Sequence, residues 1–294
     1  MGNREELFLP PRNFAGLTPP SSDLPTARAV ILPVPYDSTA EWRTGTRYGP
    51  QAIIDASRYL ELYDLELDRE IYKIGIHTLP EVEPLMNSPE SMIARVHHIA
   101  RGLIQKGKLV IMLGGEHSLS SGTVQAFKET FPDLSVLQLD AHTDLRNEYL
   151  GTKYGQASVM RRFFEICPIV QVGIRSLSRE EKLFLDQNEM TPFYMPGSAS
   201  NEFTIEQIAD SLSENVYITI DVDVFDPSIM PAVGTPEPGG MQWQEVLDIL
   251  KFIALHKHIV GFDLMEFCPQ EGPVSCAFLL AKLVYKLIGY SMPQ

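Results

Sequence analysis

The stretch SVLQLDAHTDL, residues 135–145, joins an apolar run to three potential metal ligands. Its first part, 135–139, is typical of a buried strand. The polar residues that follow include Asp140, His142 and Asp144 at alternate positions. In an extended chain, residues i, i+2 and i+4 point to the same side. The stretch therefore predicts a strand whose carboxyl end directs two carboxylates and one imidazole toward one point.

Three further segments carry similar side chains after an apolar run. Asp221 and Asp223 alternate in DVDVFDP, His117 ends the segment GGEH, and Glu266 lies in MEF. Taken singly, each has an ordinary explanation, because aspartates form turns and a histidine after two glycines is typical of a loop. Their common position after a predicted strand favours a shared site instead.

Short β-branched runs alternate with longer amphipathic stretches along the whole chain. Expected strands are 28–34, 109–113, 135–139, 169–174, 192–195, 216–220 and 259–264. Expected helices begin near Pro50 and cover 88–108, 118–131, 157–166, 178–189, 204–214, 242–257 and 274–289. This alternation predicts an α/β fold with a parallel sheet covered by helices, either open or closed into a barrel. No linker rich in Pro, Gly or Ser divides the chain, so we expect one domain, 1–294.

The candidate ligands lie at the carboxyl ends of strands, where α/β proteins collect their functional groups. Six side chains form the predicted set: His117, Asp140, His142, Asp144, Asp221 and Asp223. One ion rarely gathers four carboxylates and two imidazoles, whereas two ions that share bridging carboxylates would, at roughly 3.5–4 Å from each other. Ligation by carboxylate and imidazole favours Mn²⁺, with Fe²⁺, Co²⁺, Ni²⁺ and Zn²⁺ as alternatives.

Composition excludes some functions and leaves others open. The 294 residues carry a formal net charge of −14, which argues against a nucleic-acid partner and is compatible with a cationic substrate. No segment is long and apolar enough to span a bilayer, and the N-terminus lacks the apolar core of a signal peptide. The three cysteines, Cys167, Cys268 and Cys276, form no CxxC motif, so we expect a reducing cytoplasm.

The motifs together resemble those of the ureohydrolase (arginase/agmatinase) family. The resemblance rests on GGEHS (114–118), LDAHTDL (139–145), IDVDVFDPSIMPAVGTPEPGG (220–240), GFDLMEFCP (261–269) and PVPYDSTAEWRTGTRYGPQAII (33–54), in that family's order and spacing. It implies an open three-layer α/β/α sandwich with a mainly parallel, roughly eight-stranded sheet, preceded by an N-terminal arm over 1–26. It also implies a di-manganese centre, hydrolysis of a guanidino compound to urea and an amine, and a homo-oligomer, either trimer or hexamer.

The family pattern assigns roles to individual residues. His117, Asp140, Asp144 and Asp221 would hold one ion. His142, Asp140, Asp221 and Asp223 would hold the other. Glu266 falls where the family places its guanidinium-binding carboxylate, and Thr235 falls in the GTP stretch that lines the same pocket. Asp144 is the carboxylate expected to take part in proton transfer.

The expected substrate follows from the sequence of the whole chain, which resembles the sequences of agmatinases more than those of arginases. We expect hydrolysis of agmatine to putrescine or of aminopropylagmatine to spermidine. Alternatives are an arginase, a guanidinobutyrase, a guanidine hydrolase, or another di-metal hydrolase of the deacetylase kind, which would not need Glu266.

One position departs from the family pattern. Many agmatinase-like sequences read Ser-His where this chain has Gly155-Gln156, and that histidine is assigned to proton transfer and substrate contact. A glutamine amide does not titrate, and losing a general acid typically costs about 10²–10⁴-fold in rate. Either Asp144 carries the proton while Gln156 orients the substrate, or the chain is a metal-binding homologue of low activity. We expect a working enzyme, because the six ligands and Glu266 are all present.

Overall fold

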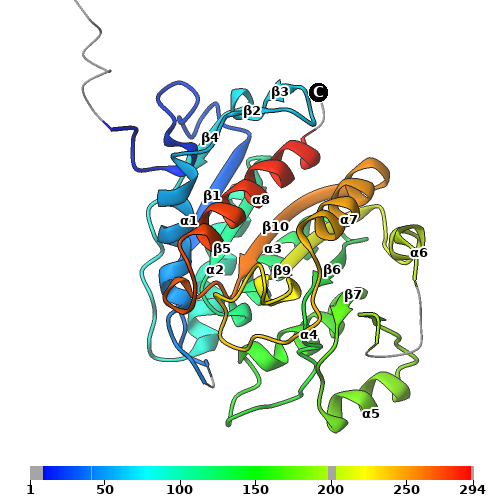
Figure 1. Ribbon diagram of the computed structural model, residues 1–294. Coiled ribbons are helices and arrows are strands. Elements are labelled where there is room, and N and C mark those ends of the chain that lie inside the picture. Colours follow the sequence, from blue (N-terminus) through cyan, green and yellow to red (C-terminus); the bar gives the residue numbers. More distant parts are fainter. Residues whose placement is uncertain (1–8, 41, 198–202, 293–294) are drawn as a thin grey trace, which may run out of the picture.

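A parallel sheet of eight strands forms the centre of the computed structural model, which describes residues 9–40, 42–197 and 203–292 (Figure 1). Its strand order is β4-β1-β5-β10-β9-β6-β7-β8, and each neighbouring pair is parallel. The strands are β1 (Ala29–Val34), β4 (Ile76–Thr78), β5 (Leu109–Gly114), β6 (Ser135–Leu139), β7 (Ile169–Ile174), β8 (Phe193–Tyr194), β9 (Asn215–Asp221) and β10 (His258–Met265). A separate antiparallel pair consists of β2 (Tyr63–Asp64) and β3 (Arg69–Glu70). Since β4 and β8 end the order, the sheet is open, which excludes the barrel.

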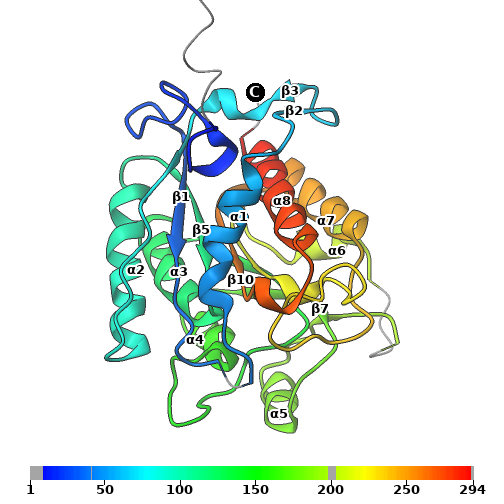
Figure 2. The same cartoon turned by 60° about the vertical axis from the view of Figure 1, so that its left-hand side comes forward.

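Helices cover both faces of the sheet and complete the predicted three-layer sandwich (Figure 2). They are α1 (Gly49–Ser57), α2 (Pro89–Ile104), α3 (Ser120–Thr130), α4 (Val159–Phe164), α5 (Arg179–Gln187), α6 (Ile205–Asp210), α7 (Trp243–His256) and α8 (Ser275–Ser291). Apolar residues of α1, α6, α7 and α8 pack on one face, and those of α2, α3, α4 and α5 pack on the other. In this sequence, strand–helix alternation therefore produces a doubly wound sheet.

Strand side chains alternate between the two cores. In β1, Ala29 and Ile31 enter the core on the α1 and α8 side, whereas Val30 and Leu32 enter the core on the α2 and α3 side. All six residues of β1 are buried. Both faces of a parallel sheet are covered, which is why such strands read as continuous apolar runs in the sequence.

The predicted elements are present, with two omissions. Sequence reasoning did not foresee β4 or the β2–β3 pair, which are two or three residues long and too short to show a period. Both ends of α2 carry ordinary helix-end signals. Ser88 accepts a hydrogen bond from the backbone N–H of Ser91, and Gly107, just beyond the helix, has a positive φ of 69°.

Part of the predicted N-terminal arm packs on the body of the protein. Phe14 and Leu17 are buried, and the backbone N–H of Phe14 donates to Thr78 Oγ1 of β4. Residues 1–8 of the arm lie outside the described residues. Among the helices that are described, none has the length and apolar character needed to cross a membrane.

Candidate metal centre and active-site cavity

The six predicted ligands lie together beyond the carboxyl ends of β5, β6 and β9. Two groups of side chains have their ligand atoms within 4.8 Å of one another. One group is His117, Asp140 and Asp221, and the other is Asp140, His142 and Asp223. Asp140 belongs to both, as expected for a bridging carboxylate. The structure therefore brings together residues that are up to 106 positions apart in the sequence.

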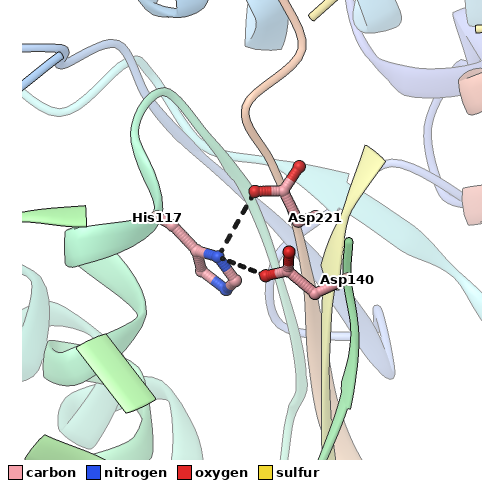
Figure 3. A group of neighbouring side chains, drawn as sticks. All are labelled: His117, Asp140 and Asp221. Atoms are coloured by element: carbon pink, nitrogen blue, oxygen red, sulfur yellow. Dashed lines mark ion pairs between the residues drawn. The ribbon is translucent and has the colours of Figure 1, made fainter. Parts of the chain in front are cut away.

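His117 directs one ring nitrogen at the aspartates (Figure 3). Its Nδ1 lies 3.3 Å from Asp140, 3.4 Å from Asp144 and 3.5 Å from Asp221. This nitrogen is buried and has no hydrogen-bond partner within the described part of the chain. A buried nitrogen in such a position has the geometry of a metal ligand rather than of a hydrogen-bonded core histidine.

The opposite nitrogen of His117 is held from behind. Its Nε2 lies 2.7 Å from Thr219 Oγ1, and the Thr219 hydroxyl donates to Asp263 Oδ1 at 2.7 Å. The hydroxyl proton is thus used on Asp263, so the oxygen accepts a hydrogen bond from the Nε2–H of His117. This arrangement assigns the ring proton to Nε2 and leaves the Nδ1 lone pair facing the aspartates.

The second group is centred on His142. Its Nδ1 lies 2.9 Å from Asp223 and 3.7 Å from Asp140. Asp221 is not part of this group but adjoins it, because its Oδ1 accepts a hydrogen bond from the backbone N–H of Asp223 at 3.0 Å. The geometry thus matches three of the four residues assigned to the second ion.

A chain of buried amides orients the shared carboxylate. Gln138 Nε2 donates to Asp140 Oδ2 at 2.6 Å, and Gln171 Nε2 donates to Gln138 Oε1 at 2.6 Å. Gln138 precedes Asp140 by two residues and therefore lies on the same side of β6. These amides fix the direction in which Asp140 presents its oxygens.

The ionised forms of the clustered carboxylates are disfavoured unless positive charge lies nearby. Burial raises the pKa of Asp140 well above its usual value, and the neighbouring charges of Asp221, Asp223 and Asp144 raise it further. Burial also raises the pKa of Asp221, again reinforced by the charge of Asp223. For His117, burial lowers the pKa, but the close approach of the negative aspartates outweighs this effect and raises the pKa well above the usual value.

All four clustered aspartates form ion pairs. Within the described residues, their ion pairs involve only His117 and His142, and no lysine or arginine. A buried group of carboxylates without a protein cation is costly unless another cation joins it. The donor set, four carboxylates and two imidazoles, fits two divalent ions of the borderline class.

A cavity of about 200 Å³ opens onto the cluster. Its walls include six residues predicted for the site: His142, Asp144, Gln156, Asp221, Thr235 and Glu266. Arg146 and Glu181, which were not predicted, also line it. The cavity therefore brings the predicted substrate-binding residues and the metal-type side chains into one space.

Two of the cavity residues have strained backbones. Asp144 has a φ of 51° and Glu266 a φ of 64°, both in the left-handed region. For non-glycine residues this conformation is uncommon and concentrates at functional sites, where the surrounding structure stabilises it. At Glu266, the backbone N–H donates to Gly115 O and the side-chain Oε1 accepts from the N–H of His117 at 2.6 Å. The Glu266 carboxylate is thus held beside the segment that carries His117.

Glu266 is also short of positive charge. It is 9% exposed, and burial raises its pKa well above the usual value. The hydrogen bond from the N–H of His117 opposes this shift without cancelling it. A cationic group that enters the cavity would stabilise the ionised carboxylate.

Gln156 lies where the sequence departs from its family pattern, and it lines the same cavity. It begins a short 3₁₀ turn, Gln156–Ser158, ahead of α4. The side-chain Oε1 is buried without a hydrogen-bond partner among the residues that the structure describes. An unpaired acceptor at a cavity wall is suited to a ligand N–H.

Sequence reasoning missed the residues that support the site from outside. Arg175 donates to the backbone carbonyls of Asp223 at 2.6 Å and Glu237 at 2.8 Å, and so joins the loop after β9 to the loop that carries Thr235. Glu237 in turn places Oε1 3.7 Å from His142 Nε2. The GTPEPGG stretch was a visible signal for Glu237, whereas nothing in the sequence distinguishes Arg175 from an ordinary surface arginine.

Comparison with known proteins agrees with this geometry. Residues 27–289 match the arginase family. The N(1)-aminopropylagmatine ureohydrolases of Synechocystis sp. and Thermus thermophilus are 37% and 38% identical to this chain, over 90% of it and 89% and 90% of their own lengths. The crystal structure of the agmatine ureohydrolase of Thermoplasma volcanium superposes with a TM-score of 0.85 at 30% identity, covering 98% of this chain and 96% of that one. The chain therefore belongs to the arginase family, as its motifs predict.

Proposed function

We propose that the protein hydrolyses the guanidino group of aminopropylagmatine or agmatine, releasing urea and spermidine or putrescine. The observation that carries the proposal is the cavity, in which Glu266 and the metal-type side chains face the same space. The names of the relatives from Synechocystis and Thermus support aminopropylagmatine, and that of the Thermoplasma structure supports agmatine.

The six clustered side chains would hold two divalent cations, and we propose Mn²⁺ as the native metal. His117, Asp140, Asp144 and Asp221 would bind the first, and His142, Asp140, Asp221 and Asp223 the second. When bound, the cations supply a water of lowered pKa and offset the negative charge that develops during attack. Metal analysis of the purified protein would test the identity and the stoichiometry.

Glu266 would bind the guanidinium. A carboxylate can accept two parallel N–H bonds from a planar guanidinium, which fixes the position of the electrophilic carbon. Burial raises the pKa of Glu266 and so disfavours its ionised form, which a bound guanidinium would stabilise, so that substrate charge and protein charge would be complementary. Thr235, on the same wall, offers a hydroxyl that can accept or donate.

Proton transfer would fall to Asp144. It lines the cavity and contacts His117, whereas Gln156 has no titratable group. Gln156 would accept an N–H bond from the substrate with its unpaired Oε1. In this assignment Asp144 carries the proton to the departing amine, and Gln156 orients the guanidino group.

Urea release tests the function directly. Agmatine, aminopropylagmatine, arginine, guanidinobutyrate and guanidine would be compared with Mn²⁺ present. We expect aminopropylagmatine or agmatine to have the highest kcat/KM. Arginine as the best substrate, or no urea from any of the five, would overturn the proposal.

The Gln156→His variant tests whether the departure from the family pattern limits activity. We expect the wild type to be active and the variant to change kcat/KM by less than about tenfold, because Asp144 already supplies the proton. If the wild type releases no urea and the variant does, the result would favour a metal-binding homologue of low activity instead.

Three further properties belong to the same proposal. We infer a single domain over 1–294 with an N-terminal arm over 1–26, a homo-oligomer that is a trimer or a hexamer, and a cytoplasmic location. Light scattering of the purified protein would test the oligomer, and a monomer would contradict it.

A further inference from the structure

Glu116 is a buried carboxylate outside the proposed ligand set. It precedes His117 and has no exposed surface. Its side chain bonds to the segment that follows β1: Oε2 accepts from the backbone N–H of Thr39, and Oε1 accepts from the Thr39 hydroxyl at 2.8 Å. The Ser118 hydroxyl donates to Oε1 as well. The Glu116 carboxylate thus holds Thr39 through two hydrogen bonds.

Thr39 continues the chain of contacts to the cavity wall. Its hydroxyl proton is used on Glu116, so its oxygen is available as an acceptor. That oxygen accepts the backbone N–H of Gln156 at 3.2 Å. The first N–H groups of any helical turn lack a partner within the turn, and Thr39 supplies one from 117 positions away.

The segment that carries Thr39 is fixed at both sides. Before it, the backbone N–H of Glu116 donates to Tyr36 O at 2.9 Å. The buried Asp37, two residues before Thr39, accepts from the N–H of Gly45 at 2.7 Å and pairs with the Arg47 side chain, and so joins the residues before and after Thr39. These contacts restrain the segment from which the Thr39 hydroxyl reaches Gln156.

We infer that Thr39, oriented by Glu116, is a positioning residue that sets Gln156 at the cavity wall and thereby contributes to the recognition of the guanidino group. The inference rests on the proposed function. It assigns a role to two residues that neither belong to the ligand cluster nor line the cavity.

The Thr39→Val variant removes the hydroxyl and keeps the shape of the side chain, and Thr39→Ser is the matched control. Valine should speed hydrogen exchange at the Gln156 amide and lower kcat/KM for aminopropylagmatine or agmatine about fivefold, the usual effect of losing one hydrogen bond, here the one that holds Gln156. Serine should restore both values. Metal content should stay at the wild-type level in both variants, whereas Tm should fall by a few degrees with valine, because the hydroxyl's bond to Glu116 is lost as well.

A double-mutant cycle separates positioning from a general structural role. In a Gln156→Ala background the valine substitution should change kcat/KM less than about twofold, because the group that it positions is already absent. The inference is wrong if valine leaves exchange at Gln156 unchanged, or if it costs the same factor in both backgrounds. A wild type that releases no urea would refute the proposed function instead, and exchange at Gln156 would still decide whether Thr39 positions it.

Discussion

Two groups of carboxylates in this protein are neutralised in different ways. The strand-end cluster consists of Asp140, Asp144, Asp221 and Asp223, and its partners are the imidazoles of His117 and His142. The lysine cluster consists of Asp64, Glu66, Lys251, Lys282 and Lys286, and joins the β2–β3 region to α7 and α8. The four aspartates of the first cluster are buried, whereas in the second Asp64 is buried and Glu66 is partly exposed.

In the lysine cluster the protein supplies its own cations. Lys286 Nζ lies 3.1 Å from Asp64 and 2.6 Å from Glu66, and Lys251 Nζ lies 2.8 Å from Glu66. For Glu66, burial raises the pKa, but the bonds to Lys251, Lys286 and Tyr290 outweigh burial and lower the pKa to about 2. Such a cluster is complete in the folded chain and serves as a structural contact.

In the strand-end cluster the pKa values of Asp140, Asp144 and Asp221 shift in the opposite direction. For Asp223, burial raises the pKa, but the charge of His142 outweighs burial and lowers it. Burial and mutual repulsion raise the pKa of Asp140 and Asp221 well above their usual value. The contrast teaches that burial alone does not mark a site for ligands. What distinguishes the strand-end cluster is that, within the described residues, no lysine or arginine pairs with its carboxylates. In the proposed function, cations from outside the chain would supply the missing charge.

The largest expected effect is at Asp221, which we propose as a ligand of both cations. Asp221→Asn keeps the size of the side chain but removes its charge, and should lower urea release by more than about 10³-fold with a matching loss of bound metal. Metal analysis and the urea assay measure both effects. Glu66→Gln, the control from the lysine cluster, should keep its metal and its activity. Equal metal content in the two variants would remove the distinction between the clusters.

Glu266→Gln tests the proposed binding of substrate at the cavity wall. The amide cannot neutralise a guanidinium, so kcat/KM should fall about 10²-fold while bound metal remains at the wild-type level. Steady-state kinetics and metal analysis on the same preparation provide the measurement. Loss of metal together with activity would instead assign Glu266 to the cations.

Lys286→Met tests the structural role of the lysine cluster. It leaves the 1% exposed Asp64 beside an apolar side chain and should lower the free energy of unfolding by about 3 kcal/mol. Lys282→Met is the matched control, because its Nζ lies 3.8 Å from Asp64 on a more exposed side chain, and should cost less than about 1 kcal/mol. Denaturant unfolding of both variants measures the difference, and equal losses would contradict it.

The smallest expected effect is a pH dependence at Glu66. Its pKa is lowered in the folded state to about 2 from the model-peptide value of 4.5, so the ionised form stabilises the fold above pH 4.5 and this contribution is lost as the pH falls toward 2. Glu66→Gln should therefore lower Tm by about 2 °C at pH 7. The difference should shrink below pH 4.5. Calorimetry across this range tests the sign, and a difference that grows in acid would be inconsistent with a lowered pKa.

Most of the candidate site could be predicted because its ligands come in short motifs attached to strands. Alternation in DAHTD and DVD places side chains on one side of an extended chain, and a parallel sheet brings the carboxyl ends of its strands to one edge. The structure places His117, Asp140, His142, Asp144, Asp221 and Asp223 at that edge. Their roles as metal ligands stay a prediction until metal is measured.

The sequence by itself determined the alternation of strands and helices, the edge at which the acidic side chains collect, and the family. Only the tertiary structure decided that the sheet is open, that β4 completes it, and that Thr39 reaches Gln156 through a hydroxyl held by Glu116. It also decided that the Asp64 and Glu66 carboxylates receive lysines whereas Asp140 and Asp221 do not. The physical reason is the distance along the chain between the residues that interact. Periodicity acts over neighbouring residues and is visible in the sequence, whereas the partner of a buried hydrogen bond or charge can lie 100 or more positions away and depends on how the whole chain packs.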